Sequence, residues 1–436
     1  MATVPKFLLI PSGYKVDKIY SVLPTNGVGD FDFARTGLGS RVNGSGLIEN
    51  VQTGIPRLNH STINGVVGQC PSLLLEAQSQ NLFTYSEDLT NAVWDKVSSF
   101  ATPNLIIAPD GTLTADKLTE QTNYNAHYYR RADFQITNGV TYTGSVFLKK
   151  GERFRTVIKT FDGVNNFESA INLSTGIVEN GNAKIFYNFN GWIGIEFTVT
   201  AAATTRTSFV FRVHLMRSEP GGTQYIGDGV SGFYTWGNQF EIGNRTSYIP
   251  TVASTETRLV ESALNAGDIN TFNSIQGVLF AEVAALKDGA NSNNRYIALT
   301  DGTFNNLVYI RFDYQNNRFV VFINVSGNSS IVFQSSFSSI YNLNKLAVKW
   351  KTNDFALWIN GVQRATSLSG STFATGTLNE LFFSSGATPF YGNTEDLRVY
   401  NTALSDEELI YLTGTLGEDY YDNYLEMSNN LNYTIQ

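Results

Sequence analysis

The best candidates for metal chemistry are three oxygen-bearing side chains in one turn-rich stretch, Asp301, Asn305 and Asn306. Protein-bound calcium takes six to eight oxygen ligands from carboxylates, amides and backbone carbonyls, and these residues could supply some of them. An ordinary turn at Asp301-Gly302 explains the same stretch nearly as well. We therefore expect no cofactor and keep Ca²⁺ as the alternative.

Catalytic groups are sparse in the sequence. The three histidines, His60, His127 and His214, are far apart and follow no metal-ligand spacing. The single cysteine, Cys70, has no obvious histidine partner, so a buried structural thiol is favoured over a nucleophile. Carboxylates are plentiful, but no pattern pairs two of them as glycoside hydrolysis requires. The sequence predicts a protein that is not an enzyme.

Aromatic residues beside neutral polar ones favour carbohydrate binding, because sugars have flat apolar faces bordered by hydroxyl groups. Tyr124, His127, Tyr128 and Tyr129 form the best such cluster and are predicted to be exposed in a loop, with an edge strand as the alternative. Trp358 is the remaining candidate for glycan binding. For each of the five tryptophans, packing in a core is nevertheless favoured, since large aromatic side chains dominate cores.

The composition favours strands and turns over helices. Aromatic residues make up 13% of the 436 residues and charged residues only 16%, while Asn, Ser, Thr and Gly supply the polarity. This mixture is typical of pleated sheets with neutral exposed faces. The net charge is −8 and no basic run is longer than two residues, so we expect no nucleic-acid partner.

Local patterns predict antiparallel sheets joined by tight turns. Ile193–Val199 and Phe209–Val213 alternate apolar with polar or small residues, as strands with one buried face do. Asn360-Gly361 follows the apolar run Phe355–Ile359 and predicts a hairpin turn. Ser405–Glu408 has the pattern of a capping box and predicts one short helix.

The expected fold class is all-β, with an irregular N-terminal anchoring arm followed by two antiparallel β-sandwich domains of jelly-roll type. The arm covers residues 1–80, where short apolar pieces alternate with Gly, Asn and Pro. It is predicted to gain its order from neighbouring subunits, because it buries too little by itself; the alternative is an irregular arm with short β segments. The sandwiches cover residues 81–260 and 261–417, and an acidic tail covers 418–436.

The sequence shows neither a signal peptide nor a membrane span. The N-terminal apolar run, Phe7–Ile10, is too short for either. One cysteine allows no intrachain disulfide, which suits assembly in a reducing cytoplasm. We expect synthesis in the cytoplasm and no membrane partner.

Three stretches resemble known families. Ile55–His60, Cys70–Glu76 and Asn81–Asp88 resemble a segment shared by phage tail, head-fibre and other virion proteins, although Asn59-His60 stands where that segment usually has Asp-Tyr. Residues 81–258 are similar to the jelly-roll, carbohydrate-binding-module-like domain of many phage structural proteins. The residues that carry this second likeness are Asn81–Asp88, Trp94, Ala108–Thr112, Ala115–Leu118, Trp236–Gly243, Thr246–Thr251 and Arg258.

The third stretch, residues 262–415, resembles the concanavalin A-like, laminin-G-type lectin fold through Ala347–Trp350, Trp358–Gly361, Phe390–Tyr400 and Leu404–Glu408. Together the resemblances imply a virion protein exposed on the particle surface, a head or tail fibre that is commonly trimeric. They imply contacts with capsid or tail proteins through residues 1–80, and glycan binding less directly, since many such domains are structural spacers. The alternatives are a polysaccharide depolymerase of the phage tail and a bacterial surface adhesin.

Overall fold

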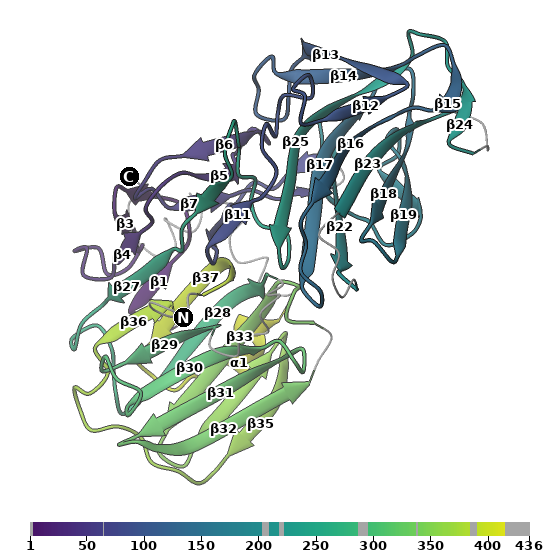
Figure 1. Cartoon of the computed structure of the whole chain (residues 1–436). Coiled ribbons are helices and arrows are strands. Elements are labelled where there is room, and N and C mark those ends of the chain that lie inside the picture. Colours follow the sequence, from purple (N-terminus) through teal and green to yellow (C-terminus); the bar gives the residue numbers. More distant parts are fainter. Residues whose placement is uncertain are drawn as a thin grey trace.

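The computed structural model describes residues 3–63, 65–202, 209–217, 222–286, 295–336, 339–383 and 390–414. Within these ranges the chain folds into antiparallel strands and one short helix, α1 (Asp406–Thr413). The larger sheets form two β-sandwiches, seen as two bodies in Figure 1. The all-β fold class expected from the sequence is thereby confirmed. No helix in the described ranges has the length and apolar character that a membrane crossing demands.

The middle sandwich is built from two six-stranded sheets, each named here after one of its central strands. The order in the β23 sheet is β12 (Asp95–Val97), β16 (Tyr128–Phe134), β23 (Phe209–Met216), β18 (Arg155–Phe161), β19 (Asn166–Asn172) and β20 (Ile177–Asn180). The order in the β25 sheet is β13 (Ser99–Ile106), β14 (Ala115–Glu120), β25 (Gly232–Ile242), β17 (Thr141–Lys150), β22 (Trp192–Thr200) and β21 (Lys184–Phe189).

The alternation seen in the sequence explains how β22 is buried. Ile193, Ile195, Phe197 and Val199 point into the core between the two sheets. The opposite side of β22 is covered at its start, because Trp192 packs in a second apolar cluster on the outer side of the β25 sheet, but Thr198 and Thr200 on that side are exposed. The first half of the strand therefore has two buried faces, whereas its second half has the single buried face that the alternating pattern predicts.

The C-terminal sandwich is built from an eight-stranded and a nine-stranded sheet. The order in the β28 sheet is β35 (Val362–Ser367), β34 (Phe355–Ile359), β33 (Asn344–Lys351), β28 (Gln276–Ala285), β37 (Gly392–Tyr400), β10 (Ser72–Leu75) and β7 (Arg57–Asn59), with β1 (Phe7–Leu9) also paired to β37. The order in the β30 sheet is β2 (Tyr14–Lys15), β3 (Lys18–Ile19), β4 (Phe31–Ala34), β27 (Ser262–Ala266), β36 (Glu380–Phe383), β29 (Arg295–Thr300), β30 (Leu307–Asp313), β31 (Arg318–Val325) and β32 (Asn328–Ser336).

Residues 3–80 obtain their order from their own chain. Strands β1 and β10 pair with β37, and β4 pairs with β27. Phe7, Leu9, Phe31 and Leu73 are fully buried in the core of the C-terminal sandwich. The segment does consist of short β pieces, but the prediction that it needs neighbouring subunits for its order is wrong, since this core offsets its chain entropy.

The part of this segment between residues 39 and 67 lies between the two sandwiches (Figure 1). It forms two hairpins, β5 (Gly39–Val42) with β6 (Ile48–Val51), and β8 (Thr62–Ile63) with β9 (Val66–Val67). Ile48 packs against Trp192 and Trp236 on the outer side of the β25 sheet. The Tyr187 hydroxyl donates to the Gly46 carbonyl at 2.7 Å. The segment therefore belongs structurally to both sandwiches.

Two local sequence predictions are confirmed. Asn360 and Gly361 have positive φ angles of 50° and 76° and connect β34 to β35. Ser405 caps α1, accepting a bond from the Glu408 amide while the Glu408 side chain accepts from the Ser405 amide. The expected tail, residues 418–436, lies outside the described residues.

Candidate functional site

The predicted aromatic cluster does not form one exposed platform. Tyr124 lies in β15 (Tyr124–Ala126), which pairs with β24 (Gln224–Ile226), and is 69% exposed. His127 is fully buried, with its Nδ1 2.6 Å from the Ser98 carbonyl oxygen and its Nε2 3.1 Å from that of Tyr225. Tyr129 is also fully buried, and its hydroxyl donates to Asn238 at 2.8 Å. The prediction of exposure is wrong for both residues, because Tyr129 packs in the core of the middle sandwich and His127 packs against Tyr225.

Tyr128 is the member of the cluster that reaches the outer side of the β23 sheet. It alternates with the buried Tyr129 along β16, so its ring points away from the core. The ring packs against His214 at 4.5 Å between centroids and lies under the Arg212 guanidinium at 5.9 Å. The edge-strand alternative comes closer to this arrangement than the loop does, although β16 lies inside the sheet.

Trp358 is 5% exposed and packs against Leu404 and Leu409 beside helix α1. This burial leaves no ring face for a sugar, so its proposed glycan contact is wrong and the preference for core packing holds. Cys70 is exposed, so the prediction of a buried thiol is also wrong. It follows the short β8–β9 hairpin and lies ahead of the buried strand β10.

The Asp301 loop fits a turn better than a calcium site. One Asp301 carboxylate oxygen accepts the Thr303 amide at 2.9 Å and the Thr303 hydroxyl at 2.6 Å, and the other accepts the Asn306 side-chain amide at 2.8 Å. The side-chain oxygen of Asn306 accepts the Ser326 amide, and the amide of Asn305 donates to the Thr303 hydroxyl. The oxygens of the predicted ligands Asp301 and Asn306 are thus already used within the loop. One carboxylate with two such amides does not provide the six oxygens that calcium requires.

A buried network of charged side chains, the junction network, joins the two sandwiches. It comprises Arg35, Arg57, Glu76, Arg258 and Glu261, all of which are at most 3% exposed. Arg57 donates to Glu76 at 2.6 Å and to Glu261 at 2.8 Å. Arg35 donates to Glu261 at 2.9 Å, and Arg258 lies 3.0 Å from Glu76. The network is held by strand β7, the end of β10 and the connections around β26 (Glu256–Arg258), which pairs with β11 (Ser79–Asn81).

The electrostatics of the network favour the charged forms of its central pair. Burial alone would raise the pKa of Glu76, but the neighbouring Arg258 and Arg57 and the Ser247 hydroxyl lower it to about 2. Burial would lower the pKa of Arg57, yet Glu261 and Glu76 raise it above its usual value. For two groups at the edge of the network, the effect of burial exceeds that of the neighbouring charges and hydrogen bonds. Burial raises the pKa of Glu241, which lies on β25 near Arg258, and lowers the pKa of Arg35.

Three of the five network residues belong to the stretches that carry the sequence resemblance. Arg57 and Glu76 belong to the first quoted stretch, and Arg258 closes the second. From the closing motif, Ser247 donates to Glu76 at 2.7 Å and receives a bond from Arg57 at 2.6 Å. Residues separated by as many as 226 positions in the chain, Arg35 and Glu261, thus meet in one interior. Their common role is to fix how the N-terminal segment, the middle sandwich and the C-terminal sandwich are joined.

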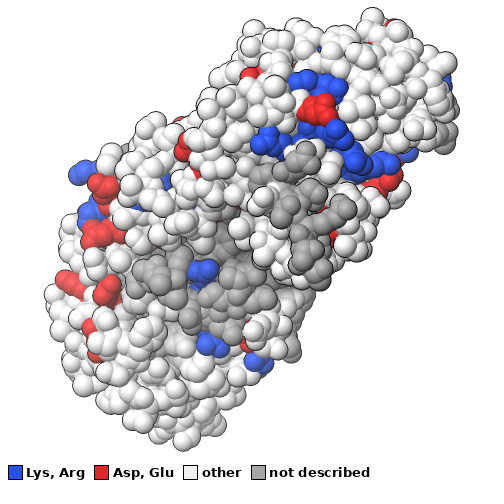
Figure 2. Space-filling model, viewed as in Figure 1, with Lys and Arg blue, Asp and Glu red and all other residues white. Residues whose placement is uncertain are grey.

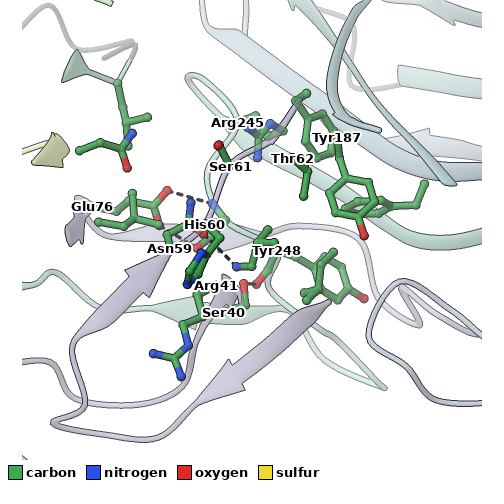
Figure 3. Close-up of a pocket in the computed structure, with 18 residues that line it drawn as sticks. Ser40, Arg41, Asn59, His60, Ser61, Thr62, Glu76, Tyr187, Arg245 and Tyr248 are labelled. Atoms are coloured by element: carbon green, nitrogen blue, oxygen red, sulfur yellow. Dashed lines mark hydrogen bonds between the residues drawn. The ribbon is translucent and has the colours of Figure 1, made fainter. Parts of the chain in front are cut away.

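A pocket with a volume of about 240 Å³ lies beside this network, where the three parts meet (Figure 3). We call it the junction pocket. The N-terminal segment, the middle sandwich and the C-terminal sandwich all contribute to its wall. The lining residues are Ser40, Arg41, Val42, Ile48, Asn59, His60, Ser61, Thr62, Leu74, Glu76, Phe147, Phe186, Tyr187, Arg245, Ser247, Tyr248, Leu286 and Asn393.

The lining combines aromatic rings with hydrogen-bond donors. The Arg245 guanidinium stacks on the Phe186 ring at 3.8 Å and donates to Glu196 at 2.8 Å. His60 is held through Nδ1 by the Gly68 carbonyl at 2.7 Å, and its Nε2 has no hydrogen bond to the described residues. Arg41 Nε is likewise buried without a described partner. A small polar molecule could therefore find an apolar wall, an unused donor at Arg41 Nε and, because His60 Nδ1 donates to the Gly68 carbonyl, an unused acceptor at His60 Nε2.

Of the pocket residues, His60 was predicted only as an isolated histidine without a metal-ligand spacing. Arg41, Phe186 and Arg245 were not predicted as site residues. No signal in the sequence marks them, because they lie on separate parts of the chain and meet only through the packing of the β5–β6 hairpin on the β25 sheet.

No family model matches the sequence, and no curated protein matches it. Among solved structures, the CBM40 of Ruminococcus gnavus IT-sialidase bound to α2,3-sialyllactose is 22% identical, with a TM-score of 0.27 over 32% of this chain and 84% of that chain. Domains LG4-5 of the mouse laminin α1 chain are 7% identical, with a TM-score of 0.23 over 79% of this chain and 94% of that chain.

The tandem CBM22 domains of Paenibacillus barcinonensis Xyn10C are 10% identical, with a TM-score of 0.26 over 76% of this chain and 99% of that chain. These are similarities between β-sandwiches, an architecture that the sheet topology of this chain establishes by itself.

Proposed function

We propose that this chain is a non-enzymatic structural protein of a bacteriophage particle, a head or tail fibre whose β-sandwiches present a surface to glycans. The observation that carries the proposal is the junction network. The residues that resemble virion proteins, among them Arg57, Glu76 and Arg258, are used together to join two sandwiches into one body.

The physical reason is that a fibre must hold its modules in a fixed orientation. A buried ion network costs desolvation, but a displaced partner leaves an uncompensated buried charge, so one arrangement is strongly preferred. Here the arrangement fixes β7 and the end of β10 of the C-terminal sandwich, and β26 of the two-stranded β11–β26 sheet, while Ser247 from the closing motif also bonds to Arg57 and Glu76. An enzyme whose domains open and close has no need of such a rigid connection, whereas a projecting shaft does.

The glycan-binding part of the proposal rests on the junction pocket. Its volume of about 240 Å³ lies below the roughly 300–1,000 Å³ typical of pockets for drug-sized ligands, so we expect it to hold one sugar unit. Phe186 and Tyr187 supply apolar wall, Arg41 Nε supplies a donor and His60 Nε2 supplies an acceptor. Tight binding by a single unit is not expected, and avidity from several copies on a particle would strengthen it.

Assembly partners follow from the same proposal. Fibres are commonly trimeric, and closed symmetry would bring three copies of the chain together. Contacts with capsid or tail proteins through residues 1–80 would use the exposed parts of this segment, such as Val16 and Val66, since its strands β1, β4 and β10 are occupied inside the C-terminal sandwich.

Electron microscopy of intact particles with a gold-labelled antibody against the purified chain tests the location. The expected result is label at one fixed position on the head or tail, removed when the antibody is first absorbed with the chain. Particles that carry no label overturn the proposal. Incubation of the chain with host polysaccharide, followed by an assay for new reducing ends, tests the non-enzymatic part; bond cleavage would favour the depolymerase instead.

A glycan array tests the pocket. The wild-type chain is expected to bind at least one neutral or acidic glycan, and His60→Ala is expected to reduce that signal. Gln69→Ala, an exposed neighbour outside the pocket, is the matched control and should leave it unchanged. Equal signals from both variants would remove the pocket from the proposal.

A further inference from the structure

A row of charged side chains crosses the outer side of the β23 sheet. Asp95, Arg130, Arg212, Lys159 and Glu168 stand directly opposite one another on five neighbouring strands, β12, β16, β23, β18 and β19. We call this row the cation ladder, because three cations stand in its middle and an acid stands at each end. Figure 2 shows Lys and Arg side chains gathered in a band on this sandwich.

The acids at the ends neutralise only the outer cations. Arg130 lies 2.7 Å from Asp95, and Lys159 lies 2.9 Å from Glu168. Arg212 has no acidic partner among the described residues, and its buried Nε has no hydrogen bond to them. It stands between two other cations, an arrangement that is destabilising because like charges directly opposite repel.

The neighbouring row holds a second polar group without a partner. His214 stands opposite Tyr128 on one side and Val157 on the other, and alternates along β23 with Val213 and Leu215 of the core. It is only 4% exposed, yet neither ring nitrogen has a hydrogen bond to the described residues. A buried imidazole without partners costs free energy, so this face carries a second unfavourable feature beside the first.

The charged groups that act on His214 are the cations Lys159 and Arg212, so its surroundings are electropositive. Burial, followed by the charges of Lys159 and Arg212, lowers the pKa of this imidazole to about 3, so it is neutral at ordinary pH. A neutral imidazole offers one donor and one acceptor to a ligand. Together with Arg212, it is therefore suited to hydrogen-bond an oxygen-rich group.

From the cation ladder and the unpartnered His214, we propose that the outer face of the β23 sheet binds an anionic group of an acidic saccharide. Arg212 is the central contact, Arg130 and Lys159 supply flanking positive charge, and the half-buried Tyr128 supplies an aromatic edge beside it. A bound carboxylate or sulfate would supply the counter-charge that Arg212 lacks.

The size of the site argues for a saccharide and against nucleic acid. Strands lie about 4.8 Å apart, so the three cations span about 10 Å across the sheet. Asp95 and Glu168 border the ladder on both sides and would repel a continuous phosphate backbone, which needs many cations in sequence. One or two anionic groups on an otherwise neutral sugar chain fit this width.

This inference deepens the glycan-binding part of the proposed function by naming a ligand class and a separate site, and it does not depend on where the protein is located. Binding of the full chain to glycans bearing uronic acid, sialic acid, sulfate or no charge would be measured by calorimetry. The expected result is that one of the acidic classes binds in a way that Arg212→Gln weakens, whereas any binding of neutral glycans in the junction pocket is not changed by Arg212→Gln.

Variants make the assignment specific. Arg212→Gln is expected to weaken binding about tenfold to 100-fold, the range for losing a charge-assisted hydrogen bond. Arg364→Gln, an exposed arginine on β35 of the other sandwich, removes the same charge and should leave affinity unchanged. If Arg212→Gln does not fold, Arg130→Gln, whose side chain is partly exposed, replaces it. Binding should also weaken as salt concentration rises.

Four results would overturn the proposal: no binding of any acidic glycan, equal weakening of neutral-glycan binding by Arg212→Gln, equal weakening by Arg364→Gln, or tighter binding of a single-stranded DNA oligonucleotide than of the acidic glycans. None of these results affects the antibody labelling of particles. Because His60→Ala lies in the junction pocket, its loss of binding is likewise separate from that of Arg212→Gln.

Discussion

Replacing Arg57 by methionine tests the importance of the junction network. Arg57 is fully buried and donates to Glu76 at 2.6 Å, to Glu261 at 2.8 Å, to the Ser247 hydroxyl at 2.6 Å and to the Ser40 carbonyl at 3.1 Å. Methionine has a similar length and fills much of the same space, so the principal change is the loss of charge and donors. Glu76 and Glu261 would keep only Arg258 and Arg35 as cationic partners.

Removing one partner of a buried ion pair typically costs about 3–5 kcal/mol, because the remaining charge is buried without compensation. We expect Arg57→Met to lower the free energy of unfolding by that amount. With a urea m-value of about 2–3 kcal/mol/M, the unfolding midpoint would fall by about 1–2 M. Tryptophan fluorescence suits the measurement, since Trp94 and Trp236 lie in the middle sandwich and Trp350 lies in the C-terminal one.

Lys18→Met is the matched control. Lys18 forms a 2.6 Å ion pair with Asp32, but the two side chains are 42% and 50% exposed, so solvent screens the interaction. Its loss should cost less than about 1 kcal/mol. If Arg57→Met destabilises the protein no more than Lys18→Met does, the reasoning about the junction network is refuted.

The remaining predictions concern single groups. The folded-state pKa of Glu76 is lowered to about 2 from an ordinary value of 4.5, so its contribution to stability is present above about pH 4.5 and is lost as the pH falls toward 2. Glu76→Gln should therefore lose less stability than the wild-type chain over this pH range, as measured by acid unfolding followed by circular dichroism. Ser405→Ala removes the cap of α1 and should destabilise the C-terminal sandwich by about 1 kcal/mol in urea, whereas Ser405→Asp, which can still cap, should not. Cys70 is exposed, so a thiol reagent should label one cysteine in the native protein as fast as in the unfolded chain; labelling only after denaturation would contradict the exposed position.

Local features of the sequence predicted local features of the fold well. Alternation in Ile193–Val199, the Asn360-Gly361 turn and the capping box at Ser405 depend on neighbours within a few residues, and each is found where it was expected. The exposure predicted for the site residues was often wrong, because the exposure of a side chain depends on which other elements pack on its strand. His127, Tyr129 and Trp358 are buried by elements distant in sequence.

The cation ladder shows the same limit. The five residues of the ladder follow no regular spacing along the chain. Only Arg130 belongs to a recognisable sequence feature, the pair of adjacent arginines Arg130-Arg131. The ladder residues form one row because five strands pair in a particular register, and a shift of one residue in any pair would turn a side chain to the other face.

The sequence by itself determined that this protein is made of strands, where several tight turns fall, where one helix begins, and that no metal-ligand spacing is present among its histidines. Tertiary structure decided that residues 3–80 complete the C-terminal sandwich, that motif residues far apart form one buried ion network, and that three cations share one face. The physical reason is range: backbone preferences and alternation act within a few residues, whereas strand order and register are set by packing between distant segments.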